Sequence, residues 1–292
     1  MGGIRALPAT GARGQPRLRS DYRSDGPRIP ISRRPVTLEI YQTADSGLVV
    51  DGGQSASIAT YPLYLESGPR RRKTMVHVLS LLGCVVRGPT TEEAVAATPE
   101  GIAAYLRFLH LHGEPVDPDA SFTVSIAEHI TSGFWLGEGD PTPGFAPDHQ
   151  PLSTVDLEMY RRRFDWLGDD LLTLLNSHGP ELLDEKPASD GRPLRTVYQH
   201  AAICQANYLR ASLGRLPDLA EALAIVRNEP SRLAVGLGEV WRVSMSRLAG
   251  LTEEQRGIPV QHGQMSWSAR RALRRMLEHA WEHHQEIVTR LS

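Results

Sequence analysis

Apolar residues recur every three or four positions through residues 153–292, a spacing typical of α-helices that bury one face. The first of these helices is predicted to begin after Ser153. Its apolar stripe consists of Leu157, Tyr160, Phe164, Leu167, Leu171 and Leu174. This half of the chain is therefore predicted to be helical.

Turn residues divide the rest of this half into three further helices. A loop that contains Pro187 and Pro193 precedes a second helix at residues 194–213. A third helix opens at Pro217 and is interrupted near Pro230, because proline cannot continue the helical hydrogen-bond ladder. The last helix starts at Trp267 and Ser268. The simplest architecture is an all-α, up-down four-helix bundle over residues 153–292.

Histidines occupy positions in these helices where a bundle core ordinarily holds leucine or isoleucine. The stripe of the last helix is Ala272, Met276, His279, His283 and Ile287, and that of the second helix is Val197, His200, Cys204 and Tyr208. Neutral imidazole binds zinc, nickel, copper or iron, and three protein ligands leave a position open for water or substrate. His200, His279 and His283 are therefore candidate metal ligands.

Other interpretations of these residues stay open. The chain has 11 histidines, so a His-x-x-x-His pair also arises by chance in ordinary helices. Cys204 is either a fourth ligand, a redox-sensitive thiol or a small buried hydrophobe. Three glutamates beside the pair are either orienting partners of the imidazoles or exposed helix charges, namely Glu278, Glu282 and Glu286. His178 and His284 are expected to face solvent.

Two segments of this half resemble a known family. Trp267-Ser-Ala-Arg-Arg-Ala-Leu-Arg-Arg-Met-Leu-Glu-His279-Ala-Trp-Glu-His283 resembles the last helix of the DinB-like superfamily, and Leu194-Arg-Thr-Val-Tyr-Gln-His200 resembles the start of its second helix. The resemblance covers residues 152–292 and implies a four-helix bundle whose three histidines bind a divalent metal such as zinc, nickel or iron. It also implies a metal-dependent transferase or hydrolase that acts on a low-molecular-weight thiol such as mycothiol or bacillithiol, although many members have no known activity.

The preceding part of the chain, residues 58–136, reads as a small α+β domain. Strands are predicted at residues 61–66, 74–82, 84–87 and 122–130, with a charged turn at 70–73. A helix is predicted from Thr90 or Thr91 to His112, because threonine caps a helix and Glu92 and Glu93 favour its positive end. Residues 137–152 are rich in glycine and proline and are predicted to be a linker. Residues 1–57, rich in arginine, glycine and proline, are predicted to be a disordered extension.

The α+β segment carries a second resemblance. His77-Val-Leu-Ser-Leu-Leu-Gly83-Cys84-Val-Val-Arg-Gly88-Pro-Thr-Thr-Glu-Glu-Ala-Val resembles the HicB antitoxin family, over residues 60–115. The family implies a sheet-and-helix fold that holds a small RNA-cleaving toxin. The DNA-binding helices that follow in such antitoxins are replaced here by an unrelated domain. This supports an alternative function: a regulatory, toxin-antitoxin-derived protein that binds a protein partner, with the metal structural or absent.

Composition narrows the range of partners. The 32 lysines and arginines nearly balance 34 acidic residues, which gives no general reason to expect nucleic acid or an anionic membrane as the partner. Two cysteines are too few for a disulfide framework, and no apolar run approaches the roughly 18 residues of a membrane span. We expect a cytoplasmic bacterial protein with a small-molecule substrate. Both resemblances are compatible with a homodimer.

Overall fold

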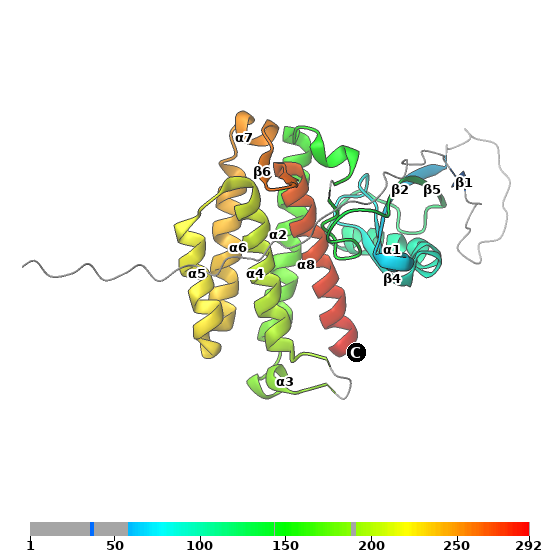
Figure 1. The fold of residues 1–292 in the computed structure, drawn as a ribbon. Coiled ribbons are helices and arrows are strands. Elements are labelled where there is room, and N and C mark those ends of the chain that lie inside the picture. Colours follow the sequence, from blue (N-terminus) through cyan, green and yellow to red (C-terminus); the bar gives the residue numbers. More distant parts are fainter. Residues whose placement is uncertain (1–35, 38–57, 143, 188–190, 292) are drawn as a thin grey trace, which may run out of the picture. The chain divides into compact units, whose positions relative to one another are not determined.

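The computed structural model describes residues 36–37, 58–142, 144–187 and 191–291 (Figure 1). Residues 35–292 form one unit that contains every element considered below. Apart from a two-residue strand, the predicted disordered extension at residues 1–57 lies outside the described residues.

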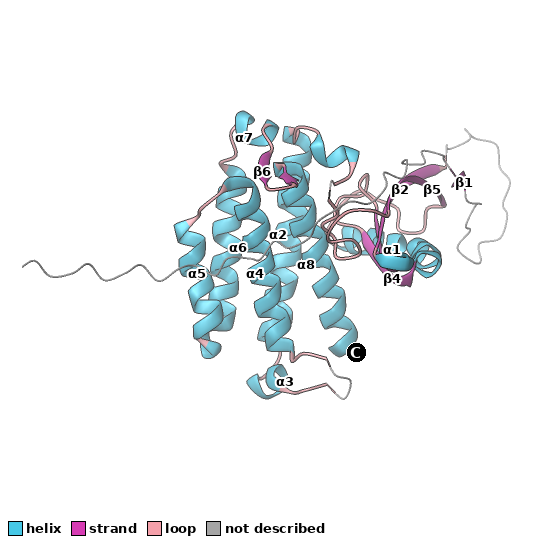
Figure 2. Cartoon of the chain, viewed as in Figure 1, coloured by secondary structure: helices cyan, strands magenta, loops and turns pink. Residues whose placement is uncertain are grey.

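A mixed five-stranded sheet forms the first part of the described chain, with the strand order β1-β5-β2-β3-β4. Its strands are β1 (Val36–Thr37), β2 (Ala59–Ser67), β3 (Arg72–His77), β4 (Val85–Thr90) and β5 (Phe122–Ile130). Strands β2 and β5 run parallel, whereas the other neighbouring pairs are antiparallel. The predicted mixture of strands and a helix is therefore confirmed for this part, and β5 has the predicted bounds (Figure 2).

Helix α1 (Thr91–Leu111) connects β4, at one edge of the sheet, to β5 on the other side of β2. The Thr90 hydroxyl accepts a hydrogen bond from the Glu93 amide at 3.2 Å, so the predicted cap is confirmed. Pro99 lies inside α1 without ending it. One face of α1 is buried, and it packs on β3 and β4.

One predicted strand is shorter than the sequence pattern indicates. We predicted a strand at residues 74–82, but β3 ends at His77 and the chain then turns back into β4. Gly83 makes this turn possible, because its φ of 101° lies in the left-handed region. A Cβ at Gly83 would also lie 2.2 Å from the Tyr105 hydroxyl. The apolar residues that suggested a longer strand, such as Leu81 and Leu82, instead pack into the core.

The second part of the chain is helical, and no helix within the described residues is long and apolar enough to cross a membrane. Its helices are α2 (Thr154–Asn176), α3 (Pro180–Asp184), α4 (Leu194–Leu213), α5 (Pro217–Asn228), α6 (Leu233–Ala249), α7 (Glu253–Gly257) and α8 (Ala269–Leu291). A short hairpin of β6 (Val260–His262) and β7 (Met265–Trp267) precedes α8, and three-residue to four-residue 3₁₀ turns lie at Pro69–Arg71, Ala146–His149 and Pro230–Arg232. The bounds of α4 agree with the prediction.

The predicted third helix is in fact two helices. Helix α5 ends at Asn228, a 3₁₀ turn begins at Pro230, and α6 then runs back alongside α5 (Figure 1). Proline lacks the amide that the next helical turn needs, and here the chain reverses instead of kinking. The helical class of this half is confirmed, whereas the count of four helices is not.

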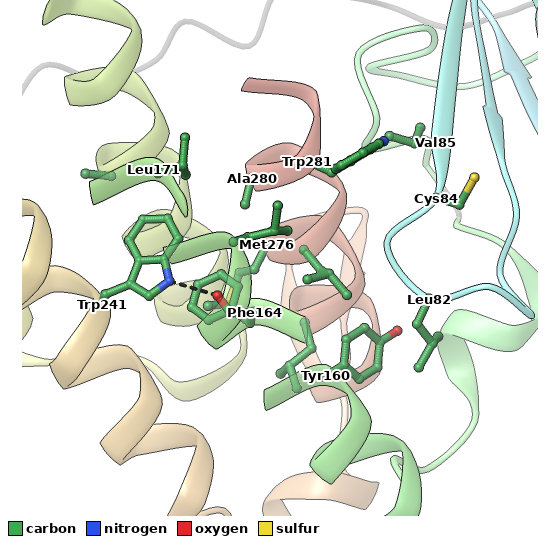
Figure 3. Packing of buried hydrophobic residues seen from close by; sticks show 14 of the residues in the cluster. Leu82, Cys84, Val85, Tyr160, Phe164, Leu171, Trp241, Met276, Ala280 and Trp281 are labelled. Carbon is green, nitrogen blue, oxygen red and sulfur yellow. Dashed lines mark hydrogen bonds between the residues drawn. The ribbon is translucent and has the colours of Figure 1, made fainter. Parts of the chain in front are cut away.

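The core of the helical part is formed by the stripes that the sequence predicts. The rings of Phe164 on α2 and Trp241 on α6 stack with centroids 4.9 Å apart, and the indole N–H donates to the Phe164 carbonyl at 3.0 Å (Figure 3). Gly168 leaves room for this indole, because a Cβ there would lie 2.1 Å from the Trp241 Nε1. Close packing of this kind holds α2, α6 and α8 together.

Helix α8 packs against the sheet part through an apolar contact. The Trp281 ring lies 4.9 Å from that of Tyr105 and 5.1 Å from that of Phe108, both on α1. Figure 3 shows Trp281 beside Val85 of β4. The Tyr105 hydroxyl, although buried, donates a hydrogen bond to the Leu82 carbonyl at 2.5 Å. Burial of these aromatic rings stabilises the contact between the two parts.

A buried network of charged groups continues the same contact. Arg274 on α8 donates to both carboxylate oxygens of Asp148, at 2.7 and 2.9 Å, and to Glu278 at 2.8 Å. Glu278 lies 3.0 Å from the Nδ1 of His77 on β3, and the other nitrogen of His77 lies 3.2 Å from Glu66. Asp148 belongs to the segment predicted to be a linker. The predicted domain boundaries stay predictions. The segment at residues 137–152 is held to α8 by the buried ion pair between Asp148 and Arg274.

Candidate metal centre

His279 and His283 lie one turn apart on α8 and are each 6% exposed. The helix begins at Ala269, and the Ser268 hydroxyl accepts the Arg271 amide at 3.0 Å. The remaining members of the predicted stripe are buried as well, namely Ala272, Met276 and Ile287. The Nε2 atoms of the two histidines are 3.2 Å apart. The predicted inward face of α8 is therefore confirmed.

His200 on α4 completes a cluster of three imidazoles. Its ring centroid lies 5.1 Å from that of His279 and 5.1 Å from that of His283. Helices α4 and α8 pack against each other along their length, which brings together residues about eighty positions apart. The Cys204 Sγ lies 3.6 Å from the His200 Nε2, and the ligand atoms of His200, Cys204 and His279 all lie within 4.8 Å of one another.

The spacing of the nitrogens fits a divalent metal. Two imidazole nitrogens that bind one tetrahedral zinc ion at about 2.0–2.1 Å are separated by about 3.3 Å. The separation of 3.2 Å between the Nε2 atoms of His279 and His283 agrees with this value. Between two neutral imidazoles only one of these nitrogens can donate to the other, whereas a shared cation would use the lone pairs of both.

The surroundings keep two of the imidazoles neutral. Burial, followed by the charges of His283 and Arg275, lowers the pKa of His279 well below its ordinary value. Burial, followed by the charges of Arg192 and His283, lowers the pKa of His200 to about 4. At neutral pH both side chains have a free lone pair, which is the form that a metal binds.

The three glutamates of α8 have three different roles. Glu286 accepts a hydrogen bond from the Nδ1 of His283 at 2.8 Å, which turns the Nε2 of that ring towards the other imidazoles. This hydrogen bond, with the nearby Arg192, lowers the pKa of Glu286 to about 2, so Glu286 is a carboxylate. Glu278 belongs to the buried network, and Glu282 faces the cavity beside the histidines. The orienting role that the sequence left open is therefore filled by Glu286.

The two histidines expected in solvent are more enclosed than predicted. His284 is directed away from the cluster, as expected, but its side chain is only 12% exposed and its ring stacks on Trp281 at 5.6 Å. Its Nε2 lies 3.5 Å from Asp170 on α2. The half-buried His178 lies 2.6 Å from the Leu174 carbonyl through its Nδ1. Neither residue contributes to the cluster.

A cavity of about 540 Å³ opens directly onto the three histidines. The helical part lines it with the histidines and with Arg192, Trp281, Glu282, Gln285 and Glu286. The sheet part lines it with Val85 and Arg87 of β4 and with Glu138. The sequence patterns did not indicate Arg87, Glu138 or Arg192. Arg87 and Glu138 approach the histidines only when the sheet part packs on α8, and Arg192 lies in the loop before α4, so no local pattern indicated these residues.

One comparison with known proteins identifies a relationship. Residues 163–287 match the family model described as the DinB superfamily, whereas no curated protein and no solved structure matches the chain. The matched residues include α4 and most of α8, and therefore His200, His279 and His283. The sheet part lies outside the match, so its resemblance to HicB proteins stays a prediction. The helical part of this chain is similar to the DinB superfamily, and its three clustered histidines lie within the similarity.

Proposed function

We propose that the chain is a divalent-metal-dependent enzyme, a transferase or hydrolase that acts on a low-molecular-weight thiol or a related small molecule. The observation that supports this most is the convergence of three histidines, two of them buried and one half-buried, at the wall of an open cavity. Three ligands leave room for a substrate atom at the metal. A purely structural metal would instead need a closed set of ligands.

The chemistry of the site follows from the groups around the cavity. A divalent cation held by the histidines would supply a Lewis acid that favours the deprotonated form of a thiol or of water near pH 7. Glu286 holds the His283 ring in one orientation through Nδ1. Both oxygens of Glu282 are buried and lack a hydrogen bond of good geometry within the described residues. Glu282 is therefore the carboxylate that we propose to accept the proton of the incoming thiol or water.

The first test is the metal content of the untagged protein, measured by plasma mass spectrometry. We expect about one equivalent of divalent metal per chain, because three imidazoles, two of them with a lowered pKa, line one cavity. The triple variant His200→Ala/His279→Ala/His283→Ala should lose this metal while its circular dichroism stays helical. His284→Ala is the matched control, because His284 lies on the same helix but points away from the cluster.

The same experiment separates this function from the alternatives. Wild-type protein that stays metal-free under replete conditions would contradict the proposal and favour the protein-binding alternative. Metal that is bound and lost in the triple variant, but with marked unfolding on chelation and no response to any thiol, would indicate a structural ion. Metal that supports turnover of a thiol substrate would establish the enzyme.

A further inference from the structure

The cavity beside the histidines has a second wall that comes from the sheet part. Val85 and Arg87 lie on β4, which pairs with β3 through the register Met75↔Arg87. Trp281 of α8 lies beside Val85 (Figure 3), so the contact between the two parts holds β4 against the helix that carries His279 and His283. The position of Arg87 at the cavity is therefore set by the fold of the sheet and by its packing on α8.

Arg87 forms an ion pair with Glu282, which lies beside the histidines on α8. The Arg87 Nε lies 2.6 Å from the Glu282 Oε1, although no hydrogen bond of good geometry joins them. The Arg87 side chain is 57% exposed, and Glu282 is its ion-pair partner among the described residues. Its remaining N–H groups are therefore available to a molecule in the cavity.

Arg192 provides a second cation in the same cavity. It contacts Glu286 at 3.4 Å, which is long for a charge-assisted hydrogen bond. Its side chain is 36% exposed. Arg192 precedes α4, whereas Arg87 is on β4, so the two guanidinium groups reach the cavity from different parts of the chain.

We propose that the sheet part completes the metal pocket, and that Arg87, together with Arg192, selects small molecules that carry a carboxylate. This inference rests on the proposed function, because it names the chemical class of the substrate for the same site. It also gives the sheet part a role within one active site, in place of a separate partner-binding role.

The charges around the cavity favour an anion over an amine. Each of the three carboxylates has a cation beside it. Glu138 pairs with Lys73 at 3.1 Å, Glu286 with His283 and Arg192, and Glu282 with Arg87 at 2.6 Å. A divalent cation at the histidines, together with Arg87 and Arg192, would carry four positive charges. The three glutamates of the cavity lining carry three negative charges, which leaves a net charge of plus one. A single positive surplus matches a carboxylate better than a dianionic phosphate. The planar fork of arginine also suits the two oxygens of a carboxylate.

The test compares three small thiols of similar size that differ in charge. They are mercaptoacetate, 2-mercaptoethanol and cysteamine. Besides the thiol, they carry a carboxylate, a neutral hydroxyl and an ammonium group, respectively. Each is titrated into the cobalt-loaded full chain, and binding is followed by the change in the visible absorption of cobalt. Mercaptoacetate should bind about tenfold more tightly than 2-mercaptoethanol, the effect of one charge-assisted hydrogen-bonded contact, and cysteamine should bind most weakly.

Variants assign this preference to the sheet part. Arg87→Met should reduce the preference for mercaptoacetate over 2-mercaptoethanol to about threefold or less. The ratio of the two affinities is the readout, because any effect of the variant through Glu282 applies to both thiols. Arg87→Lys keeps the charge but loses the planar fork, so it should retain part of the preference. Arg107→Met is the matched control, because Arg107 is an exposed arginine of the same part whose recorded partner is Glu100. Unchanged cobalt stoichiometry and circular dichroism show that each variant folds.

The outcomes separate this inference from the proposed function. Equal binding of the three thiols, tighter binding of cysteamine, or an Arg87→Met variant with the wild-type preference would overturn the inference and leave thiol binding intact. If the cobalt absorption changes with acetate but with none of the three thiols, and Arg87→Met abolishes the acetate response, the thiol function is rejected and the carboxylate site is retained. If the cobalt absorption changes with neither the thiols nor acetate, both the thiol function and the carboxylate site are rejected.

Discussion

Helix α8 carries two clusters of buried polar side chains, the histidines of the candidate metal centre and the arginine-glutamate network at the sheet. In the network, Arg274 binds both Asp148 and Glu278, and Glu278 also contacts His77. In the metal centre, His279 and His283 direct two ring nitrogens at each other across 3.2 Å. Buried charges that satisfy one another hold a fold together, whereas imidazole nitrogens that converge beside an open cavity mark a place for a ligand.

The largest expected effect concerns the network. Arg274→Met leaves Asp148 buried without its ion-pair partner and removes one of the two arginines that bind Glu278. Removing one partner of a buried ion pair costs about 3–5 kcal/mol. Urea unfolding followed by circular dichroism should show this loss in the free energy of unfolding. An Arg270→Met control alters a more exposed arginine on the same helix and should have a smaller effect. Equal losses in both variants would contradict the distinction between the clusters.

The metal centre should respond in the opposite way. His279→Ala removes a desolvated polar group, so the metal-free protein should be no less stable than the wild type. The wild type should gain about 2.7 kcal/mol when the free metal concentration is 100 times its Kd, and the variant should lose this gain. Thermal unfolding with and without added zinc measures both quantities. Strong destabilisation of the metal-free variant would show that His279 stabilises the fold by packing, which would contradict this prediction.

A smaller effect is expected from the partner of His283. Glu286→Gln removes the charge of the carboxylate that orients the ring, while the side chain keeps its size. Metal affinity should fall about 10-fold to 100-fold, since partners of this kind tune the basicity of the ligand. Competition with a fluorescent zinc chelator measures the change. Glu181→Gln, on α3 and outside the cavity lining, is a control for the loss of one negative charge.

The smallest expected effect is a dependence of stability on pH through His77. Burial alone would lower the pKa of His77, but Glu278 and Glu66 outweigh burial and the opposing charge of Arg274, so the pKa is raised above 6.5. Protonated His77 therefore stabilises the folded state below pH 6.5, and this contribution is lost as the pH rises through the raised pKa.

The difference between wild type and His77→Asn isolates this contribution. The thermal midpoint of the wild type should exceed that of the variant more at about pH 6 than at about pH 9. A difference that is constant or grows with pH would show that His77 is neutral in the folded protein.

The candidate metal ligands could be predicted from the sequence because helical periodicity is a local property. Residues four apart lie on one face of a helix, so His279 and His283 had to be neighbours once α8 formed. The bounds of α4 and β5 and the caps before α1 and α8 follow from local hydrogen-bonding rules in the same way. The convergence of His200 with this pair came from the resemblance and from the inward stripe of α4.

What the tertiary structure alone decided is the partner of each side chain. Glu278, Glu282 and Glu286 are equally spaced on α8, yet one is bound in the network, one faces the cavity and one holds a histidine. Whether Pro230 kinks a helix or reverses the chain depends on whether α5 can pack against α6. The place of Arg87 in the cavity depends on the packing of a distant strand. Local rules determine faces and ends, whereas contacts between elements far apart in sequence depend on the free energy of the whole fold.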